Sequence, residues 1–429
     1  MVGRQIVADR VIRADGSPLV DDGMISTADG RIVHIGPRDR ATPLPDHADR
    51  YVGCTALPGL IDCHAHVTLA SDGRTYEAMM QDPDEMLALV SVPNLSRHLA
   101  AGVTTVRDNG GRGIVPFVVR DAVERGYLTG PRVLASGSPI TPPGDHMHWC
   151  GGAADGIDAI RAAVHRLVEQ GADHIKVIAS GGASQGSSPT RSTYGFDELR
   201  TAVETSHALE RTTTAHCRAR APMADVIRAG FDCIEHAEFI VEPRTPGDHA
   251  MSNTRGEMVY EPELAAMLED HGTWISYTIQ AGGYAELVGL RDRQREHPTS
   301  PQGERRTRQL EEYFASKVAL LSELVRAGLA PQVVISSDAG PSGVPFGLLH
   351  QGLELAVEAG MSPSEAIDSV TSKAARVCGL AGEVGALTPG SRADVLVVRG
   401  DPTRDIRDLA EVVAVYQGGE RVVPPPIAG

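Results

Sequence analysis

Lysine and histidine are the side chains whose placement in this chain is most informative about chemistry. The 429 residues include 16 histidines but only three lysines, Lys176, Lys317 and Lys373. Lys176 lies inside the apolar run HIKVIAS, where a charged ammonium is destabilising unless it is paired or modified. A lysine at such a position, in a chain that uses so few, predicts a chemical role for Lys176.

Four histidines and one aspartate stand at the ends of short apolar runs, where a core would favour apolar residues. His64 and His66 alternate along one run, so both imidazoles would face the same side of a strand. The others are His216, His236 and Asp338. Each taken alone is as well explained by a buried core histidine or a helix-capping aspartate. Together they form a nitrogen and oxygen ligand set suited to zinc or a similar divalent ion.

Eight β-branched runs, separated by segments with helical periodicity, would position these side chains. Three segments with helical spacing are 158–171, 196–211 and 362–379. The pattern predicts an α/β fold, a closed parallel (β/α)8 barrel resembling a TIM barrel, with the active site at the carboxyl ends of its strands. An open doubly wound sheet is the alternative, but no GxGxxG follows the first strand. The predicted strands are 60–66, 103–108, 132–137, 174–180, 212–217, 233–238, 273–278 and 332–338.

Both ends of the chain consist of short β-like runs broken by turns. Neither end could bury two sheet faces alone, so we expect them to pack together as one small discontinuous β-sandwich domain. The expected division assigns residues 1–57 and 384–429 to that domain and 58–383 to the barrel. Two stretches, 182–195 and 289–309, interrupt the strand and helix alternation and are expected over the barrel mouth, although solvated surface loops are the plainer reading.

Composition limits the partners and the compartment. The chain has 40 basic and 56 acidic side chains, a net charge of −16 with histidine neutral. It has no basic run, so nucleic acid is not expected as a partner. No apolar stretch is long enough to span a bilayer, so no membrane partner is expected. The six cysteines form no CxxC pair, and we expect buried thiols in a cytoplasmic protein.

The order of the candidate ligands resembles the binuclear-metal branch of the amidohydrolase superfamily. ALPGLIDCHAH at the first strand and GALTPGSRADVLVV near the end are similar to motifs of that superfamily at the junctions with its β-sandwich domain. HIKVIASGG, the 20-residue gap from His216 to His236 and the GDH stretch ending at His146 look most like its prolidase-like group, related to imidazolonepropionases. The resemblance covers nearly the whole chain.

This resemblance implies two divalent metal ions, expected to be zinc, and an N6-carboxylysine at Lys176 that bridges them. His64, His66 and Asp338 would hold the more buried ion, and His216 and His236 the more exposed one. A bridging water would be activated to hydroxide, because metal binding lowers its pKa to about 7. Asp338 would carry a proton from the attacking hydroxide to the departing amine.

Further residues are candidates for contacts with the substrate. His146 is the expected donor to the scissile carbonyl, with a solvent-facing loop histidine as the alternative. Several prolidase-like enzymes have a tyrosine where this chain has Arg218, and Arg218 and Arg191 could bind a substrate carboxylate. Tyr194 and Trp149 could line an acyl pocket. Surface or packing roles compete for all of these, and for Arg191 a surface role is at least as well supported.

The expected function is metal-dependent hydrolysis of an amide or peptide-like C–N bond in a small molecule. Candidate substrates are N-acyl amino acids, Xaa-Pro dipeptides and related amides or carbamates. The alternatives are a cyclic-amide or lactone hydrolase or a deaminase on the same barrel, which Lys176 disfavours because those relatives lack the bridging lysine. A non-catalytic scaffold is a third reading, disfavoured because all six ligand positions are present. A homo-oligomer is expected from the resemblance.

Overall fold

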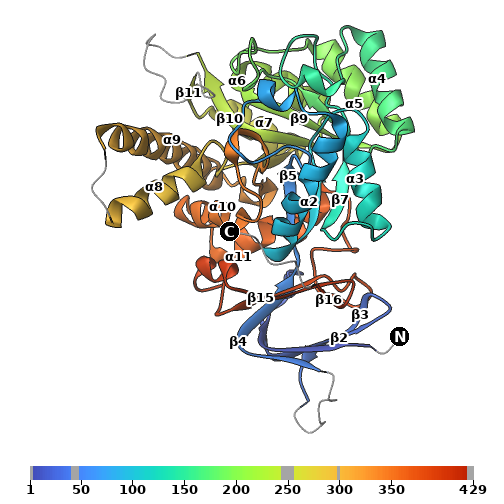
Figure 1. Cartoon of the computed structure of the whole chain (residues 1–429), viewed down its shortest axis with the longest axis vertical. Coiled ribbons are helices and arrows are strands. Elements are labelled where there is room, and N and C mark those ends of the chain that lie inside the picture. Colours follow the sequence, from blue (N-terminus) through green and yellow to red (C-terminus); the bar gives the residue numbers. More distant parts are fainter. Residues whose placement is uncertain (1–2, 40–47, 243–255, 297–299, 423–429) are drawn as a thin grey trace.

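The structure is a computed structural model of the whole chain and describes residues 3–39, 48–242, 256–296 and 300–422 (Figure 1). Within these residues, the eight predicted strands are present, each within a few residues of its expected bounds. β6 shows why: all six residues of VTTVRD are buried, as expected for a parallel strand covered on both faces. The strands are β5 (Leu60–Ala65), β6 (Val103–Asp108), β7 (Arg132–Ala135), β8 (His174–Ile178), β9 (Thr212–Ala219), β10 (Cys233–Val241), β12 (Trp274–Tyr277) and β13 (Val333–Ile335).

These strands form two parallel sheets, which agrees with the predicted TIM-barrel-like α/β fold. One sheet has the order β5-β6-β7 and the other the order β13-β12-β10-β9-β8, while the short β11 (Glu257–Met258) pairs antiparallel with β10. Isolated parallel bridges join the two sheets at both edges, between Ala65 and Ala339 and between Ile140 and Val177. All parallel strands therefore end on one side, where their last residues can meet.

Helices follow most of the strands and surround them in Figure 1. α4, for example, buries Ile160, Val164 and Leu167 at helical spacing. The α-helices are α1 (Tyr76–Met79), α2 (Asp84–Ala100), α3 (Val115–Glu124), α4 (Ile157–Glu169), α5 (Phe196–Ala208), α6 (Arg220–Ala229), α7 (Pro262–His271), α8 (Tyr284–Glu296), α9 (Pro301–Arg326), α10 (Leu349–Glu358), α11 (Pro363–Ser369) and α12 (Ser372–Val377). Single turns of 3-10 helix cover His148–Cys150, Ala330–Gln332, Pro341–Gly343 and Ile406–Ala410.

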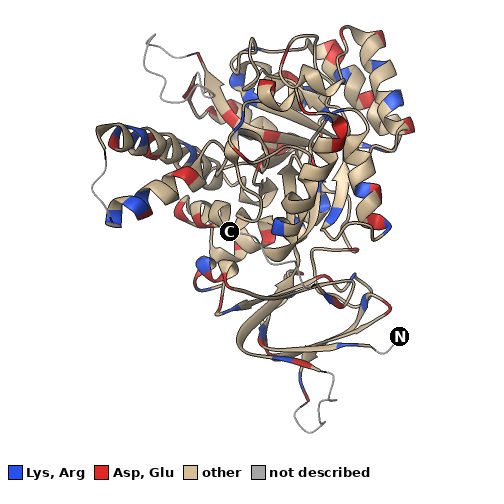
Figure 2. Ribbon diagram, in the orientation of Figure 1, with Lys and Arg blue, Asp and Glu red and all other residues tan. Residues whose placement is uncertain are grey.

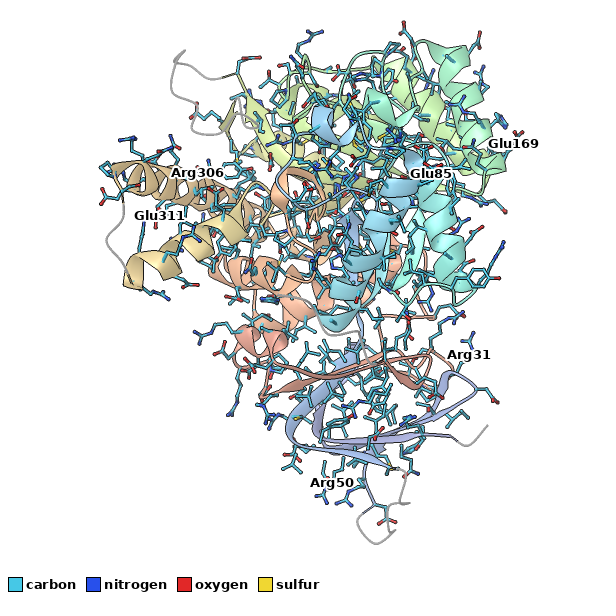
Figure 3. The ribbon with its side chains drawn as sticks, in the orientation of Figure 1. Arg31, Arg50, Glu85, Glu169, Arg306 and Glu311 are labelled. Atoms are coloured by element: carbon cyan, nitrogen blue, oxygen red, sulfur yellow. The ribbon has the colours of Figure 1, made fainter. Side chains whose placement is uncertain are left out.

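Two predicted segments differ from the structure. The helix expected over 362–379 is two helices, because α11 ends at Ser369 and α12 begins at Ser372. The stretch 289–309 is mostly helical, divided between α8 and α9, rather than a loop; its residues 297–299 lie outside the described residues. Two ion pairs join the helices, Arg306 with Glu286 and Arg291 with Glu311. Figure 3 labels Arg306 and Glu311 on α9.

Strands from both ends of the chain form one mixed sheet below the parallel strands (Figure 1). Its order is β16-β15-β14-β4-β1-β2-β3, so the C-terminal β14 pairs antiparallel with the N-terminal β4. Along β14 the side chains alternate: Leu396 and Val398 join the large core around the parallel strands, while Val395 and Val397 join the core of the terminal sheet. The strands are β1 (Gln5–Val11), β2 (Val20–Ala28), β3 (Arg31–Pro37), β4 (Asp49–Pro58), β14 (Val395–Arg399), β15 (Val412–Gln417) and β16 (Glu420–Val422).

The surface charges, the helix lengths and the cysteines can be compared with what the composition predicts. Acidic and basic side chains are interspersed along the outer helices (Figure 2). None of the described helices has both the length and the apolar character needed to cross a bilayer. Five of the six cysteines are buried and Cys378 is partly exposed; all six are free thiols. The predicted burial of the thiols is thus confirmed for every cysteine except Cys378.

Candidate metal centre

One pocket opens where the parallel strands end, and it contains about 660 Å³ of empty space, counting the part open to solvent. Two ligand candidates have left-handed backbone, which is unfavourable for a residue with a side chain: His236 has φ +72° and Asp338 has φ +56°. Such strain concentrates at functional sites. Five of the six predicted ligands line the pocket: His66, Lys176, His216, His236 and Asp338.

His64, His66 and Asp338 form the first cluster, although they come from opposite ends of the barrel sequence. His64 Nε2 lies 3.3 Å from His66 Nε2 and 3.4 Å from Asp338 Oδ1. His66 Nε2 lies 3.5 Å from the same oxygen. The backbone explains the approach, because the Asp338 N–H donates to the His64 carbonyl at 2.8 Å beside the bridge between Ala65 and Ala339. Two ring nitrogens and one carboxylate oxygen, all able to coordinate a metal, therefore lie close together.

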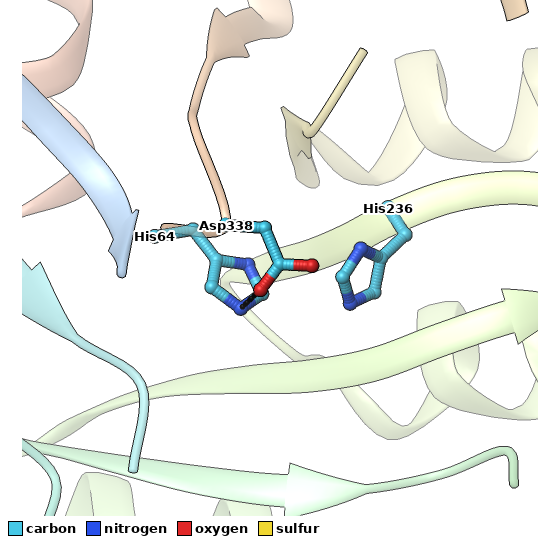
Figure 4. Close-up of side chains that lie close together, drawn as sticks. All are labelled: His64, His236 and Asp338. Carbon is cyan, nitrogen blue, oxygen red and sulfur yellow. Dashed lines mark ion pairs between the residues drawn. The ribbon is translucent and has the colours of Figure 1, made fainter. Parts of the chain in front are cut away.

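His216 and His236 form a second cluster next to the first. His236 Nε2 lies 3.0 Å from His216 Nδ1, and the rings of His64 and His236 have centroids 4.9 Å apart. Figure 4 shows His64, Asp338 and His236 converging from three different elements; one ligand atom of each lies within 4.8 Å of the others, close enough to hold a metal ion. β9 and β10 are paired neighbours, which brings His216 and His236 to the same edge.

The ring nitrogens that face away from these clusters each have a fixed partner. His64 Nδ1 lies 2.7 Å from Glu235 Oε2, and His236 Nδ1 lies 2.8 Å from Thr278 Oγ1. His66 Nδ1 and His216 Nε2 face the carbonyl oxygens of Gly110 and Gly181, at 2.8 and 3.3 Å. A carbonyl only accepts, so these two nitrogens carry the proton and their inward nitrogens present lone pairs. This arrangement is the one that orients histidine ligands around metals.

Electrostatics also suit metal binding. Burial lowers the pKa values of His66, His216 and His236 well below the usual range, so these imidazoles are neutral at pH 7 and can coordinate. Burial raises the pKa of Asp338. Burial also opposes ionisation of Glu235, but the guanidinium of Arg107, at 2.8 Å, holds the pKa of that carboxyl well below its usual range. Glu235 therefore stays charged and orients His64.

Lys176 lies among these ligands without a conventional partner. Its side chain is 1% exposed, and within the described part of the chain its Nζ has no hydrogen-bond partner. Burial lowers its pKa to about 8, an effect that the charge of Glu235 partly opposes. A buried polar atom without a partner is unfavourable by roughly 1–3 kcal/mol, and more for a charged group. The donor set around Lys176 is thus compatible with a metal centre.

His146 lies at the rim of the clusters, with its ring centroid 4.7 Å from that of His216. Its Nδ1 is 2.9 Å from Ser184 Oγ, which also accepts from the backbone N–H of Met147. When the Ser184 hydroxyl donates to Nδ1, Nε2–H is the donor of His146. Burial lowers the pKa of His146 to about 3, so the ring is neutral. A Cβ at Gly182 would lie 2.5 Å from this ring, so only glycine fits there.

Arg218 lines the same pocket as part of a charged layer. Arg218 follows His216 by two residues on β9, and Glu238 follows His236 by two residues on β10. The guanidinium donates to Glu238 Oε2 at 2.6 Å, and Lys317 Nζ from α9 lies 3.0 Å from Glu238 Oε1. Burial opposes the charge on Glu238, but Arg218 and Lys317 lower its pKa to about 2.

The three other proposed substrate contacts do not line the pocket. Arg191 is exposed, and Tyr194 is buried with its hydroxyl donating to the Ala154 carbonyl at 2.7 Å. Trp149 packs beside Tyr76, with ring centroids 6.0 Å apart, and it is Tyr76 that lines the pocket. Substrate binding by Arg191, Tyr194 and Trp149 stays a prediction.

Sequence reasoning missed several residues that position the site. Glu235 and Glu238 are carboxylates inside the apolar strand CIEHAEFIV, the same signal that drew attention to Lys176. Lys317 is one of three lysines and falls in line with Phe314, Leu321 and Leu324 on the buried face of α9. Both signals were readable from the sequence. Thr278 and Ser184 gave none, because hydroxyl residues are common at strand ends and in loops.

Comparisons with known proteins agree with this geometry. The Amidohydrolase family matches residues 55–422. An ochratoxinase from Aspergillus niger is 26% identical, covering 97% of this chain and 85% of the relative. An imidazolonepropionase from Rhizorhabdus wittichii is 25% identical, covering 89% of each chain. A crystal structure of a Xaa-Pro dipeptidase with bound methionine in the active site has the same fold, with a TM-score of 0.79 over 98% of this chain and 99% of that one, at 23% identity. Because the family match spans most of the sequence, the chain belongs to the amidohydrolase family and is a hydrolase of carbon–nitrogen bonds of the amide type.

Proposed function

We propose that the chain is a binuclear metal-dependent hydrolase whose Lys176 is carboxylated. The observation that carries this proposal is the buried Lys176 Nζ, which has no hydrogen-bond partner among the described residues yet lies among four histidines and a carboxylate. Its pKa of about 8 leaves a substantial neutral fraction near neutral pH. The neutral amine adds to carbon dioxide and releases one proton, which gives a carbamate with two oxygen ligands.

The proposed centre holds two divalent ions, and zinc suits the nitrogen and oxygen donors. His64, His66 and Asp338 would bind the more buried ion, His216 and His236 the more exposed one, and the carbamate of Lys176 both. When bound, the ions would lower the pKa of a water molecule and polarise the substrate carbonyl.

The protein groups then have separate tasks. Asp338 accepts a proton at its carboxylate and delivers it to the departing amine; burial, which raises its pKa, makes it able to hold that proton. His146 donates its Nε2–H to the carbonyl oxygen as negative charge develops there, and Ser184 keeps it in the right tautomer. Arg218 binds a carboxylate on the amine side of the scissile bond.

The substrate class we propose is an N-acyl amino acid, a Xaa-Pro dipeptide, or a related amide or carbamate. The likeness to a Xaa-Pro dipeptidase and to an ochratoxinase supports this range. Arg218, in place of the tyrosine of several prolidase-like enzymes, supports a substrate that carries a carboxylate. The match to an imidazolonepropionase keeps cyclic-amide opening as a second candidate.

The proposal includes the larger assembly. A closed eight-stranded barrel is supported by the bridges at both sheet edges. The division into a barrel, 58–383, and a domain from 1–57 and 384–429 is supported by the separate core of the terminal sheet. We also propose that the protein is cytoplasmic and forms a homo-oligomer.

A turnover screen with metal analysis tests the function. Protein is stripped by chelation, reloaded with zinc in the presence or absence of bicarbonate, and assayed on N-acyl amino acids, Xaa-Pro dipeptides, aryl carbamates, cyclic amides and lactones. We expect about two zinc ions per chain and turnover of an open-chain amide that requires bicarbonate during reloading. One ion per chain, or activity confined to cyclic amides or lactones, contradicts the proposal.

A further inference from the structure

The wall of the pocket beyond the metal ligands contains three buried charges, and the proposed chemistry uses only that of Arg218 directly. Lys317 and Glu238 are 1% and 2% exposed, and Arg218 is 8% exposed. Together they have a formal charge of +1. The alternation of strands places them, since Arg218 and Glu238 lie two residues beyond His216 and His236, one layer nearer the mouth.

Lys317 is held so that all three of its N–H donors are used. Its Nζ donates to the carbonyl oxygens of Thr278 and Ala281, at 2.8 and 3.0 Å, and pairs with Glu238 at 3.0 Å. The ring of Tyr313, one turn earlier on α9, lies 5.2 Å from the same nitrogen. Lys317 therefore has no donor left for a substrate, and it acts through Glu238.

The charge of Lys317 determines what Arg218 can do. Without Lys317, Glu238 would be balanced only by Arg218, and the pair would present no net charge to a substrate. With Lys317 present, Glu238 is neutralised from the α9 side, and the positive charge of Arg218 remains effective toward the pocket. The other charged groups that line the pocket, Lys176 and Asp338, belong to the metal layer.

We propose that Lys317 is a specificity-determining residue: it keeps the layer formed with Glu238 and Arg218 at +1 and so selects substrates with a single carboxylate on the amine side of the scissile bond. This inference rests on the proposed function and deepens it. Lys317 and Glu238 are positioning residues, while Arg218 makes the contact. An interaction of one unit charge in a partly buried site is enough for a selectivity of tenfold or more.

A set of four proteins separates charge from packing. Wild type has +1 in this layer, Lys317→Met has zero, Glu238→Gln has +2, and the double variant Glu238→Gln with Lys317→Met has +1 again. Each is reloaded with zinc and bicarbonate, checked for metal content and thermal unfolding, and assayed on matched pairs: N-acetyl-L-leucine against N-acetyl-L-leucinamide by acetate release, and leucyl-proline against leucyl-prolinamide by leucine release.

The readout is the ratio of kcat/KM for the acid to that for the carboxamide. We expect the ratio to fall at least tenfold in Lys317→Met, to return to within about threefold of wild type in the double variant, and not to fall in Glu238→Gln. Lys317→Arg, which keeps the charge, should retain the wild-type ratio. If Lys317→Met does not fold, the double variant and Glu238→Gln still test the inference, because neither ratio should fall tenfold below that of wild type.

Some outcomes would overturn only the role of Lys317, and another would contradict the proposed function. Wild type that cleaves acid and carboxamide equally, or a ratio in Lys317→Met equal to wild type, overturns this inference but leaves the proposed amide hydrolysis intact. A double variant whose ratio stays as low as that of Lys317→Met also overturns it, because packing rather than charge would then be decisive. Loss of all amide turnover in metal-loaded wild type contradicts the proposed function itself.

Discussion

The floor of the pocket, formed by Lys176 and the candidate metal ligands around it, and the wall, formed by Arg218, Glu238 and Lys317, each contain a buried lysine. The two lysines have opposite hydrogen-bonding surroundings. On the floor, Lys176 Nζ has no hydrogen-bond partner in the described residues. In the wall, Lys317 Nζ has two carbonyl oxygens and a carboxylate within 3.0 Å. Both side chains are 1% exposed. Burial alone therefore does not tell a reactive lysine from a fixed one; the number of acceptors around the nitrogen does.

The difference follows from what each surrounding element supplies. Lys176 lines the pocket together with imidazoles whose far nitrogens are already held, so their lone pairs face the pocket. Around Lys317 the chain turns after β12 and exposes the carbonyls of Thr278 and Ala281. A cluster of lone pairs attracts metal ions, whereas a turn rich in carbonyls satisfies an ammonium.

Replacing each lysine is the strongest way to break this comparison. Lys176→Ala should lose at least one metal ion per chain and reduce kcat/KM by at least about 10³-fold, because the proposed bridging ligand and the charge stabilisation it would organise are both removed. Lys317→Met should keep wild-type metal content. Lys373→Ala is the matched control, since Lys373 Nζ donates to the Ala330 carbonyl away from the pocket. Metal analysis and steady-state kinetics measure all three; wild-type metal content and turnover in Lys176→Ala would sink the binuclear assignment.

Asp338 tests the floor by a different route. Asp338→Asn keeps the shape of the side chain but cannot shuttle a proton, so kcat should fall by roughly 10²–10⁴-fold. Its carboxylate oxygen, which lies close to His64 and His66, is also replaced, so the affinity for the more buried ion of the proposed centre should drop. Measured kcat at matched metal loading separates the two effects. A variant with wild-type kcat when fully loaded would show that another group moves the proton.

The sequence predicted the floor far better than the wall. His64, His66, His216, His236 and Asp338 are rare or polar types at strand ends, and the topology brings them together. Their assignment as ligands is still a prediction, but their convergence needed only strand order. The parallel α/β arrangement was predictable for the same reason, since β-branched runs alternate with helical periodicity.

The wall depended on contacts that periodicity does not encode. Lys317 reaches Glu238 because α9 packs against the turn after β12. The stretch 289–309, which the sequence predicts as a loop, belongs mostly to the helices α8 and α9. Arg191, Tyr194 and Trp149 were chosen by proximity in sequence to the mouth, and the structure places them outside the pocket lining. Loop geometry, rather than residue type, decided these positions.

The buried contacts of Glu238 with Arg218 and Lys317 predict that the stability of the protein depends on pH. Glu238 has a pKa of about 2 in the folded chain against an ordinary 4.5. A lowered folded-state pKa contributes stability that is fully present above pH 4.5 and is lost as the pH falls toward 2; this gap corresponds to about 3 kcal/mol. The free energy of unfolding of wild type minus that of Glu238→Gln, from urea titrations at pH 3 to 7, should be largest above pH 5 and shrink below it. A difference independent of pH would mean that Glu238 contributes by packing alone.

The smallest expected effect is at Thr278, which contacts residues of both the floor and the wall. The Thr278 carbonyl accepts from Lys317 Nζ, and its hydroxyl lies 2.8 Å from His236 Nδ1, so Thr278 links both regions. Thr278→Val keeps the volume and the carbonyl but removes the hydroxyl, which should weaken metal binding by about tenfold, in the lower part of the range for groups that orient metal ligands. Ser276→Ala is the matched control, because that hydroxyl on the same strand lies 2.9 Å from Ser336 Oγ instead. Zinc affinity by competition with a chelator measures both, and the acid to carboxamide ratio should stay unchanged, since the Lys317 contacts survive. A lowered ratio in Thr278→Val would mean that floor and wall act as one unit.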